Sequence, residues 1–214
     1  MKLDNKRTIL TGFAFLSICA FWQMYDSIVP LILTNTFHLN ETYSGAIMAA
    51  DNVLALFLLP LFGAISDKTH TKIGKRMPFI LFGTGLAIIL MNMLPLIDNS
   101  YAAAPTTFKT VSFVVVLGLL LVAMGTYRSP AVALMPDITP KPLRSKGNAI
   151  INLMGALGGV IYLGVAAVMY PNSKVEGLAH VNYQPLFMVV SAIMFVGGFA
   201  VCAVGQFFTL SDTL

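Results

Sequence analysis

Long runs of apolar residues, separated by short polar stretches, dominate the chain from one end to the other. Runs of about eighteen or more apolar residues are typical of helices that span a membrane. The connecting stretches are too short to form a soluble domain. We therefore expect residues 1–214 to fold as one all-α integral membrane domain, a bundle of six transmembrane helices, with spans at about 8–35, 44–65, 78–97, 111–136, 148–170 and 185–208.

The composition agrees with a membrane protein and argues against several other classes. Hydrophobic residues make up 57% of the chain and the mean hydropathy is +0.81, whereas soluble domains are about half apolar. The formal charge of +4 needs no nucleic-acid partner, because membrane proteins collect lysine and arginine in cytoplasmic loops. Cys19 and Cys202 fall inside apolar runs and are expected to be packed thiols. His38, His70 and His180 are expected in loops, too scattered for a metal site, and no motif predicts a cofactor.

The distribution of cations gives the expected orientation of the bundle. Cytoplasmic loops of membrane proteins carry an excess of lysine and arginine. Ten cations precede the first span or lie between spans two and three or spans four and five: Lys2, Lys6, Arg7, Lys68, Lys72, Lys75, Arg76, Lys141, Arg144 and Lys146. The opposite side has Lys109 and Lys174. Both termini are therefore predicted to be cytoplasmic.

The stretch GAISDKTHTKIGKRMPFI, between the second and third spans, concentrates charge in an otherwise apolar chain. Gly63 has no side chain, so another helix can approach closely there. Asp67 and Asp137 each end a predicted helix, where the helix dipole disfavours an anion and the carboxylate needs a nearby cation. Lys75 or Arg76 could pair with Asp137 and clasp the cytoplasmic ends together. The alternative is a solvated basic loop with incidental acids.

Two stretches of the chain resemble a known family. The segment GAISDK, ending at Lys68, and the later GKR, beginning at Gly74, are similar to the signature between helices 2 and 3 of the major facilitator superfamily of transporters. Six residues rather than the usual two separate the aspartate from the second glycine. This longer form, with SPAVALMPDITP and SKGNAIINLMGALGG further on, resembles the plant sucrose–proton symporters and the glycoside–pentoside–hexuronide cation symporters. The two stretches also resemble bacterial members of the sucrose-symporter branch.

The resemblance implies a carrier of twelve helices, built from two six-helix halves. This chain resembles the N-terminal half, so its expected partner is a second six-helix unit, either a C-terminal half or a second copy of the chain. The resemblance also implies a conformational gate made of Gly63, Asp67, Lys68, Gly74, Lys75, Arg76 and Asp137. The lipid bilayer in which the chain lies is expected to be the cytoplasmic membrane of a bacterium.

Three ionisable residues lie inside predicted spans: Asp26, Asp51 and Arg128. Such residues are costly in a bilayer, so they usually face a cavity or one another. Counted from the helix midpoints, both aspartates lie about one turn outward of the centre, on consecutive helices. If they face a common cavity, lost hydration and mutual repulsion would let one of them carry a proton at neutral pH. The alternative is that each hydrogen-bonds a neighbouring helix.

The residues around Asp26 have the chemistry that binds a sugar. Trp22 and Gln23 lie four and three positions before Asp26, so they share its helix face. Pro30 has no N–H, which leaves the Asp26 carbonyl without its normal helical donor. The indole ring would cover apolar C–H surface while the amide, carboxylate and carbonyl groups bind hydroxyls.

Three further polar residues are candidates for the same cavity. Arg128 could bind substrate, act as counter-ion to a carboxylate, or brace the fourth span. In the sucrose symporters the intramembrane arginine of this helix aligns with Val132, one turn away. Asn52 could reach the cavity or pack against another helix, and Asn152 is the candidate on the fifth span. That span also carries a pair of small residues suited to close packing: Gly155 and Gly159.

The sequence thus predicts the N-terminal half of a secondary active transporter that moves a sugar or glycoside by alternating access. A proton is the expected coupling ion, with sodium as the alternative; Asp26 or Asp51 would take it, and Arg128 would adjust the charge state. The rival hypothesis is a six-helix membrane protein that does not transport, such as a regulatory subunit or a fragment. An enzyme is not expected, because the chain has no HExxH or GxSxG motif.

Overall fold

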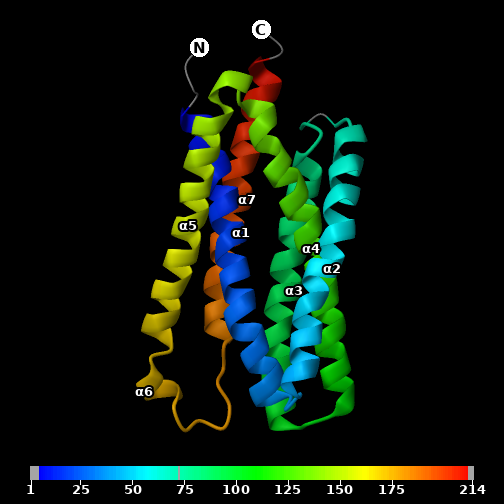
Figure 1. The fold of residues 1–214 in the computed structure, drawn as a ribbon, viewed down its shortest axis with the longest axis vertical. Helices are drawn as coiled ribbons and strands as arrows, with labels where there is room; N and C mark the ends of the chain where they lie inside the picture. Colours follow the sequence, from blue (N-terminus) through cyan, green and yellow to red (C-terminus); the bar gives the residue numbers. More distant parts are fainter. Residues whose placement is uncertain (1–4, 72, 212–214) are drawn as a thin grey trace.

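The computed structural model describes residues 5–71 and 73–211, which form a bundle of long helices without strands (Figure 1). The long helices are α1 (Asn5–Leu31), α2 (Glu41–Lys68), α3 (Met77–Ala103), α4 (Thr107–Ile138), α5 (Arg144–Met169) and α7 (Gln184–Ser211). The shorter elements are the π-helix η1 (Ile32–Thr36), the 3-10 helix η2 (Lys141–Leu143) and α6 (Asn172–Val175). Within the described residues, six helices are long and apolar enough to cross a membrane, which confirms the predicted fold class.

The start of α1 and the end of α7 lie at the same end of the bundle, together with the connections α2–α3 and α4–α5 (Figure 1). Because these connections carry most of the cations, the positive-inside rule predicts that this end faces the cytoplasm, and we call it the cytoplasmic end. The turn between α3 and α4 and the segment around α6 lie at the opposite, outer end (Figure 1). Lys2 and Lys72, which contribute to the charge bias, lie outside the described residues, as do the side chains of Arg7 and Cys202.

The helices pack in a pattern that repeats between the two halves of the chain. Helix α1 contacts α5 and α7, while α4 contacts α2 and α3; α1 meets α4, and α3 meets α7. Exchanging α1 with α4, α2 with α5 and α3 with α7 leaves this pattern unchanged, as expected for two three-helix repeats. The apolar part of α1 is the most buried of the spans, whereas those of α2 and α5 are the least buried. Helices α2 and α5 are therefore free to face lipid or another protein.

Glycines set the closest contact between α1 and α5. A Cβ atom on Gly158 would overlap the backbone carbonyl of Leu16, and one on Gly155 would lie 2.9 Å from Cys19 Sγ. A Cβ on Gly159 would lie 3.8 Å from Gln23 Oε1, an ordinary contact distance. Close packing thus uses Gly155 and Gly158 rather than the expected Gly155 and Gly159, because the crossing point of the two helices selects the glycines that face it.

Helix α3 extends farthest beyond its predicted span, from the expected end at residue 97 to Ala103. The prediction ended where the apolar run ends. In the structure the added turns are held by polar contacts: the N–H of Ala104 donates to Ser100 O, and Lys109 Nζ donates to the carbonyls of both residues at 2.8 Å. The outer end of α3 is therefore polar but helical.

Candidate functional site

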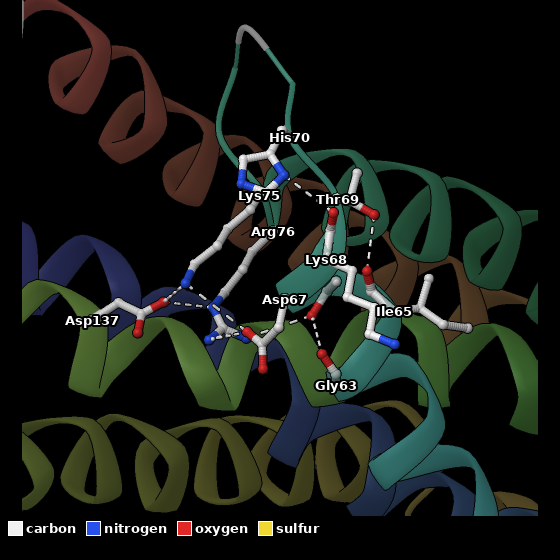
Figure 2. Close-up of polar contacts among 10 residues, drawn as sticks. Gly63, Ile65, Asp67, Lys68, Thr69, His70, Lys75, Arg76 and Asp137 are labelled. Carbon is white, nitrogen blue, oxygen red and sulfur yellow. Dashed lines mark hydrogen bonds and ion pairs between the residues drawn. The ribbon is translucent and has the colours of Figure 1, made fainter.

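Four charged side chains meet at the cytoplasmic ends of α2, α3 and α4 (Figure 2). Arg76, which precedes α3, lies between two aspartates: its Nε donates to Asp137 Oδ2 at 2.6 Å, and its Nη2 lies 2.9 Å from Asp67 Oδ1. Lys75 Nζ lies 3.7 Å from Asp137 and 3.9 Å from Asp67. One arginine thus joins the last turn of α2 to the end of α4. We call these four residues the cytoplasmic clasp.

Arg76 is the central residue of the cytoplasmic clasp. Its side chain is only 7% exposed, whereas those of Asp67 and Asp137 are 56% and 35% exposed. The planar guanidinium presents several N–H donors in fixed directions, which lets one arginine bridge two carboxylates. Lys75 is 45% exposed and more distant, and exposed lysine pairs of this kind contribute little to stability.

Gly63 and Gly74, the two glycines of the motif, are suited to their positions for different structural reasons. Gly74 has φ = 101°, in the left-handed region that favours glycine, and its carbonyl accepts from Thr71 Oγ1 at 2.6 Å. A Cβ on Gly63 would lie 3.2 Å from Ser129 Oγ of α4, so this glycine permits close approach of α2 to α4. Lys68 is exposed, and among the described side chains it takes no part in the ion pairs of the cytoplasmic clasp.

Replacing Arg76 with methionine should loosen the ends of α2 and α4, because methionine fills space without pairing with Asp67 or Asp137. We expect the free energy of unfolding to fall by about 2 kcal/mol, less than for a fully buried pair, since both aspartates are partly exposed. Thermal unfolding in detergent should then show a melting temperature about 4–8 °C lower. Lys75→Met is the matched control, with an expected loss within about 1 kcal/mol. Equal melting temperatures for the two variants would contradict the central place of Arg76.

A second group of polar residues lies between α1, α2 and α4. Trp22, Asp51 and Arg128 line one narrow pocket, whose other walls are apolar: Leu54, Ala55, Leu58, Leu59, Leu121 and Gly125. Arg128 Cζ lies 5.5 Å from the centre of the Trp22 ring, which is a cation–π arrangement. The Trp22 indole N–H is buried and has no hydrogen-bond partner among the described residues. The residues that line this central pocket therefore include a carboxylate side chain, a guanidinium side chain and an indole whose N–H has no partner among the described residues.

The two intramembrane aspartates, Asp26 and Asp51, differ in their surroundings. Their charges are close enough to interact with one another, and both interact with Tyr25. Asp51 Oδ1 accepts a hydrogen bond from Asn52 Nδ2 at 2.8 Å. Asp51 lines the central pocket, whereas Asp26 is exposed beside it on α1. The structure therefore separates a pocket carboxylate from a surface carboxylate.

Tyr25 is a candidate that the sequence analysis did not include. Its side chain is fully buried, and its hydroxyl has no hydrogen-bond partner within the described part of the chain. The Tyr25 ring lies edge-on to Trp22 at 5.3 Å. The signal that could have found it is spacing, because Tyr25 is three positions after Trp22 and therefore on a similar face of α1.

The remaining predicted site residues do not join the central pocket. Asp26, Asn52 and Asn152 are exposed on α1, α2 and α5, and Gln23 faces Gly159 of α5. A carboxylate or amide inside a bilayer is costly against lipid, so such side chains face water or other protein. These exposed groups therefore indicate that parts of α1, α2 and α5 are not covered by lipid.

A separate groove opens nearer the cytoplasm, between α1, α4 and α5. Its lining includes Val132, the position at which the resemblance places an intramembrane arginine, together with Asn148 and Arg144. Arg144 donates to the carbonyl of Pro136 at 3.0 Å, so it holds the end of α4. Nowhere in the described residues do three or more histidine, cysteine, aspartate or glutamate side chains gather in a way that could hold a metal ion.

Comparison with known proteins identifies the family of the chain. A family model described as Major Facilitator Superfamily matches residues 11–209. The sucrose transport protein SUC3 of Arabidopsis thaliana is 28% identical over 160 residues, which cover 68% of this chain and 26% of that protein. The sucrose transport protein SUT3 of Oryza sativa subsp. japonica is 31% identical over 123 residues, covering 51% of this chain and 24% of that protein.

A third relative covers more of the chain. The alpha-ketoglutarate permease of Escherichia coli (strain K12) is 26% identical over 198 residues, covering 89% of this chain and 41% of that protein. The matched regions thus take up between 24% and 41% of the lengths of these three relatives. The family model, by contrast, matches nearly all of the present chain. The chain belongs to the Major Facilitator Superfamily.

Proposed function

We propose that the chain is the N-terminal half of a cation-coupled carrier for a sugar or glycoside. The observation that supports this most strongly is the central pocket, in which Trp22, Asp51 and Arg128 lie together inside the membrane. An indole ring covers the apolar C–H face of a sugar, while a carboxylate and a guanidinium hydrogen-bond its hydroxyls. Two of the relatives described above are named as sucrose transport proteins.

The charges of the pocket favour a neutral solute over a dicarboxylate. One relative is named as an alpha-ketoglutarate permease, and Arg128 alone would suit a carboxylate solute. Asp51 lines the same pocket, however, and its charge offsets that of Arg128. While Asp51 is ionised, before it takes up a proton, an anionic solute would meet repulsion from it, whereas an uncharged sugar would not.

We assign the coupling proton to Asp51, with Asp26 as the neighbouring acid. Protonation would neutralise Asp51 and so remove the cost of enclosing a carboxylate while the two halves of a carrier rock around the site. Each proton that moves inward is worth about 2.3 kcal/mol per 100 mV of membrane potential. Sodium is the alternative coupling ion, and it would use the same carboxylates.

The cytoplasmic clasp and the exposed polar groups supply the other parts of the proposal. The ion pairs of Arg76 with Asp67 and Asp137 would form in one conformation and break in the other, biasing the carrier between its inward and outward states. Asp26, Asn52 and Asn152 would face a solute path that a second six-helix unit completes, either a C-terminal half or a second copy. The proposed location is the cytoplasmic membrane of a bacterium.

Solute-driven proton uptake tests this proposal. The protein would be extracted with its native partners, reconstituted into liposomes containing a pH-sensitive dye, and supplied with sucrose, simple glycosides or α-ketoglutarate. We expect the liposome interior to acidify when a sugar or glycoside is added outside, because symport carries protons in with the solute. Acidification with α-ketoglutarate alone would overturn the choice of solute. Uptake of sugar that depends on sodium and moves no protons would overturn the choice of ion.

A further inference from the structure

A buried acid lies at the outer end of the bundle, separate from the central pocket and the cytoplasmic clasp. Asp98, near the end of α3, is 0% exposed, and neither of its carboxyl oxygens has a close hydrogen-bond partner among the described residues. His180, on the segment before α7, places Nε2 3.8 Å from Asp98 Oδ2. A buried carboxylate that is neither neutralised nor paired carries a large free-energy penalty. Asp98 therefore needs a proton of its own or a cation beside it.

Neighbouring hydrogen bonds determine which ring nitrogen of His180 carries a proton. The backbone N–H of Gln184 donates to Asn182 Oδ1, which also accepts from Asn99 Nδ2 at 2.9 Å. Asn99 must therefore turn its other amide atom, the oxygen, toward the ring, where it lies 2.8 Å from His180 Nε2. An amide oxygen only accepts, so Nε2 carries a proton. The state of Nδ1 is what can vary.

Thr36 of η1 lies between the variable ring nitrogen and the buried acid. Its Oγ1 is 3.4 Å from His180 Nδ1, and its side chain lies near enough to Asp98 to interact with the carboxyl group. A hydroxyl has one donor hydrogen and can also accept, so it can connect the two groups in either direction. The π-helical turn η1, closed by a bond from the N–H of Phe37 to Ile32 O, is the element that brings Thr36 to this position.

Two arrangements of this chain hold the same number of protons. In one, the protonated Asp98 donates to Thr36 Oγ1, and the Thr36 hydroxyl donates to Nδ1 of a neutral His180. In the other, the imidazolium Nδ1–H donates to Thr36 Oγ1, and the Thr36 hydroxyl donates to the Asp98 carboxylate. Each arrangement satisfies all three side chains with one shared proton. Removing that proton leaves a buried carboxylate next to a neutral ring.

We propose that Asp98, Thr36 and His180 form a binding site for one proton at the outer end of the bundle. The bound proton fastens the segment 176–183 to α3 and to η1, because all three elements contribute a member of the site. A rise in pH on the outer side removes the proton and releases the segment. The proposal is independent of the coupling proton assigned to Asp51.

None of the other ionisable groups described near this outer proton site can compensate the charge of Asp98 in place of the proton. Burial raises the pKa of Tyr183, and the charge of Asp98 raises that pKa further, followed by Tyr170 and Tyr162, so Tyr183 stays a neutral phenol at physiological pH. Lys109 of α4 is engaged by the carbonyls at the end of α3. Within the described residues no third acid, histidine or cysteine joins Asp98 and His180 to make a metal site.

Hydrogen–deuterium exchange of the segment 176–183 tests the proposal. The purified protein, in lipid nanodiscs with its native partners, would be labelled between about pH 6 and about pH 9, with rates corrected for intrinsic exchange. We expect protection of the segment to fall about tenfold or more as pH rises. The turn at residues 104–107, at the same end of the bundle, serves as the internal control and should keep constant protection.

Matched variants separate a proton site from ordinary packing. Asp98→Asn keeps the shape of the side chain but cannot be ionised, so segment 176–183 of this variant should be equally protected at all pH values. Thr36→Val should lower the protection of segment 176–183 at every pH measured. Thr36→Ser keeps the hydroxyl and should give the same pH profile as the wild type. His38→Gln, which changes another histidine at the outer end, should also leave the profile unchanged. Protection in wild type that does not vary with pH would overturn the proposal. If Asp98→Asn fails to fold, the proposal is tested by the wild type alone, by comparing how the protection of segment 176–183 and of residues 104–107 changes with pH.

Discussion

Replacing Gly158 with alanine is expected to force α1 and α5 apart and to destabilise the bundle strongly. The added Cβ would overlap the carbonyl oxygen of Leu16 and lie 2.8 Å from its carbonyl carbon. Both atoms belong to the backbone of α1, so neither can rotate away and the helices must move. Overpacking costs about 1–3 kcal/mol where side chains can adjust. We therefore expect a loss of about 3 kcal/mol or more, measured by thermal unfolding in detergent.

Gly164→Ala is the matched control on the same helix. A Cβ at Gly164 meets no atom within 4 Å, and alanine favours a helix over glycine by up to about 1 kcal/mol. Its melting temperature should equal or exceed that of the wild type. If both alanine variants melted at the wild-type temperature, α1 and α5 would not cross at Gly158, and the register of these helices would be wrong.

Asp51→Asn is expected to abolish proton coupling while leaving solute binding in place. The amide keeps the shape of the side chain, and so the form of the central pocket, but cannot bind or release a proton. We expect uptake driven by a pH gradient to fall about tenfold or more, because the gradient no longer contributes to the driving force. Exchange of labelled for unlabelled solute across liposomes, which needs no net proton movement, should persist.

Two further acid-to-amide variants show whether the effect belongs to Asp51. Glu41→Gln changes an exposed acid in the first turn of the same helix and should leave gradient-driven uptake unchanged. Asp26→Asn changes the exposed neighbour and should reduce uptake less than Asp51→Asn does. If Asp51→Asn kept full gradient-driven uptake and Asp26→Asn lost it, the assignment to Asp51 would be wrong and Asp26 of α1 would be the coupling residue.

The sequence predicts the spans well because their signal is local. A run of apolar residues long enough to cross a bilayer has few alternatives to a helix, and the six runs correspond to six helices in the described part of the chain that are long and apolar enough to cross a membrane. The pairing of Arg76 with Asp137 could also be anticipated, since acids at helix C-termini need cations. The sequence alone left open whether Lys75 or Arg76 pairs with Asp137. Arg76 is the buried residue of the two because of the way in which α3 begins.

The features that the sequence did not reveal depend on contacts between helices. Asp98 follows the last apolar residue of the third run, so the prediction placed it in a loop, whereas α3 continues past it and buries it. His180 lies in an irregular segment with no periodicity to indicate its neighbours. Likewise, the choice of Gly158 over Gly159 is made by the crossing of α1 and α5. Such pairings between distant segments have no local pattern from which they could be inferred.

The native mass of the membrane-extracted particle tests the central claim most directly. The account holds that exposed polar groups on α1, α2 and α5 line a solute path that a second six-helix unit completes. Native mass spectrometry from lipid nanodiscs should therefore find this 23.1 kDa chain in particles with a second copy or with another six-helix chain. Particles that hold one copy of this chain and no other protein, and that still take up solute, would contradict the account.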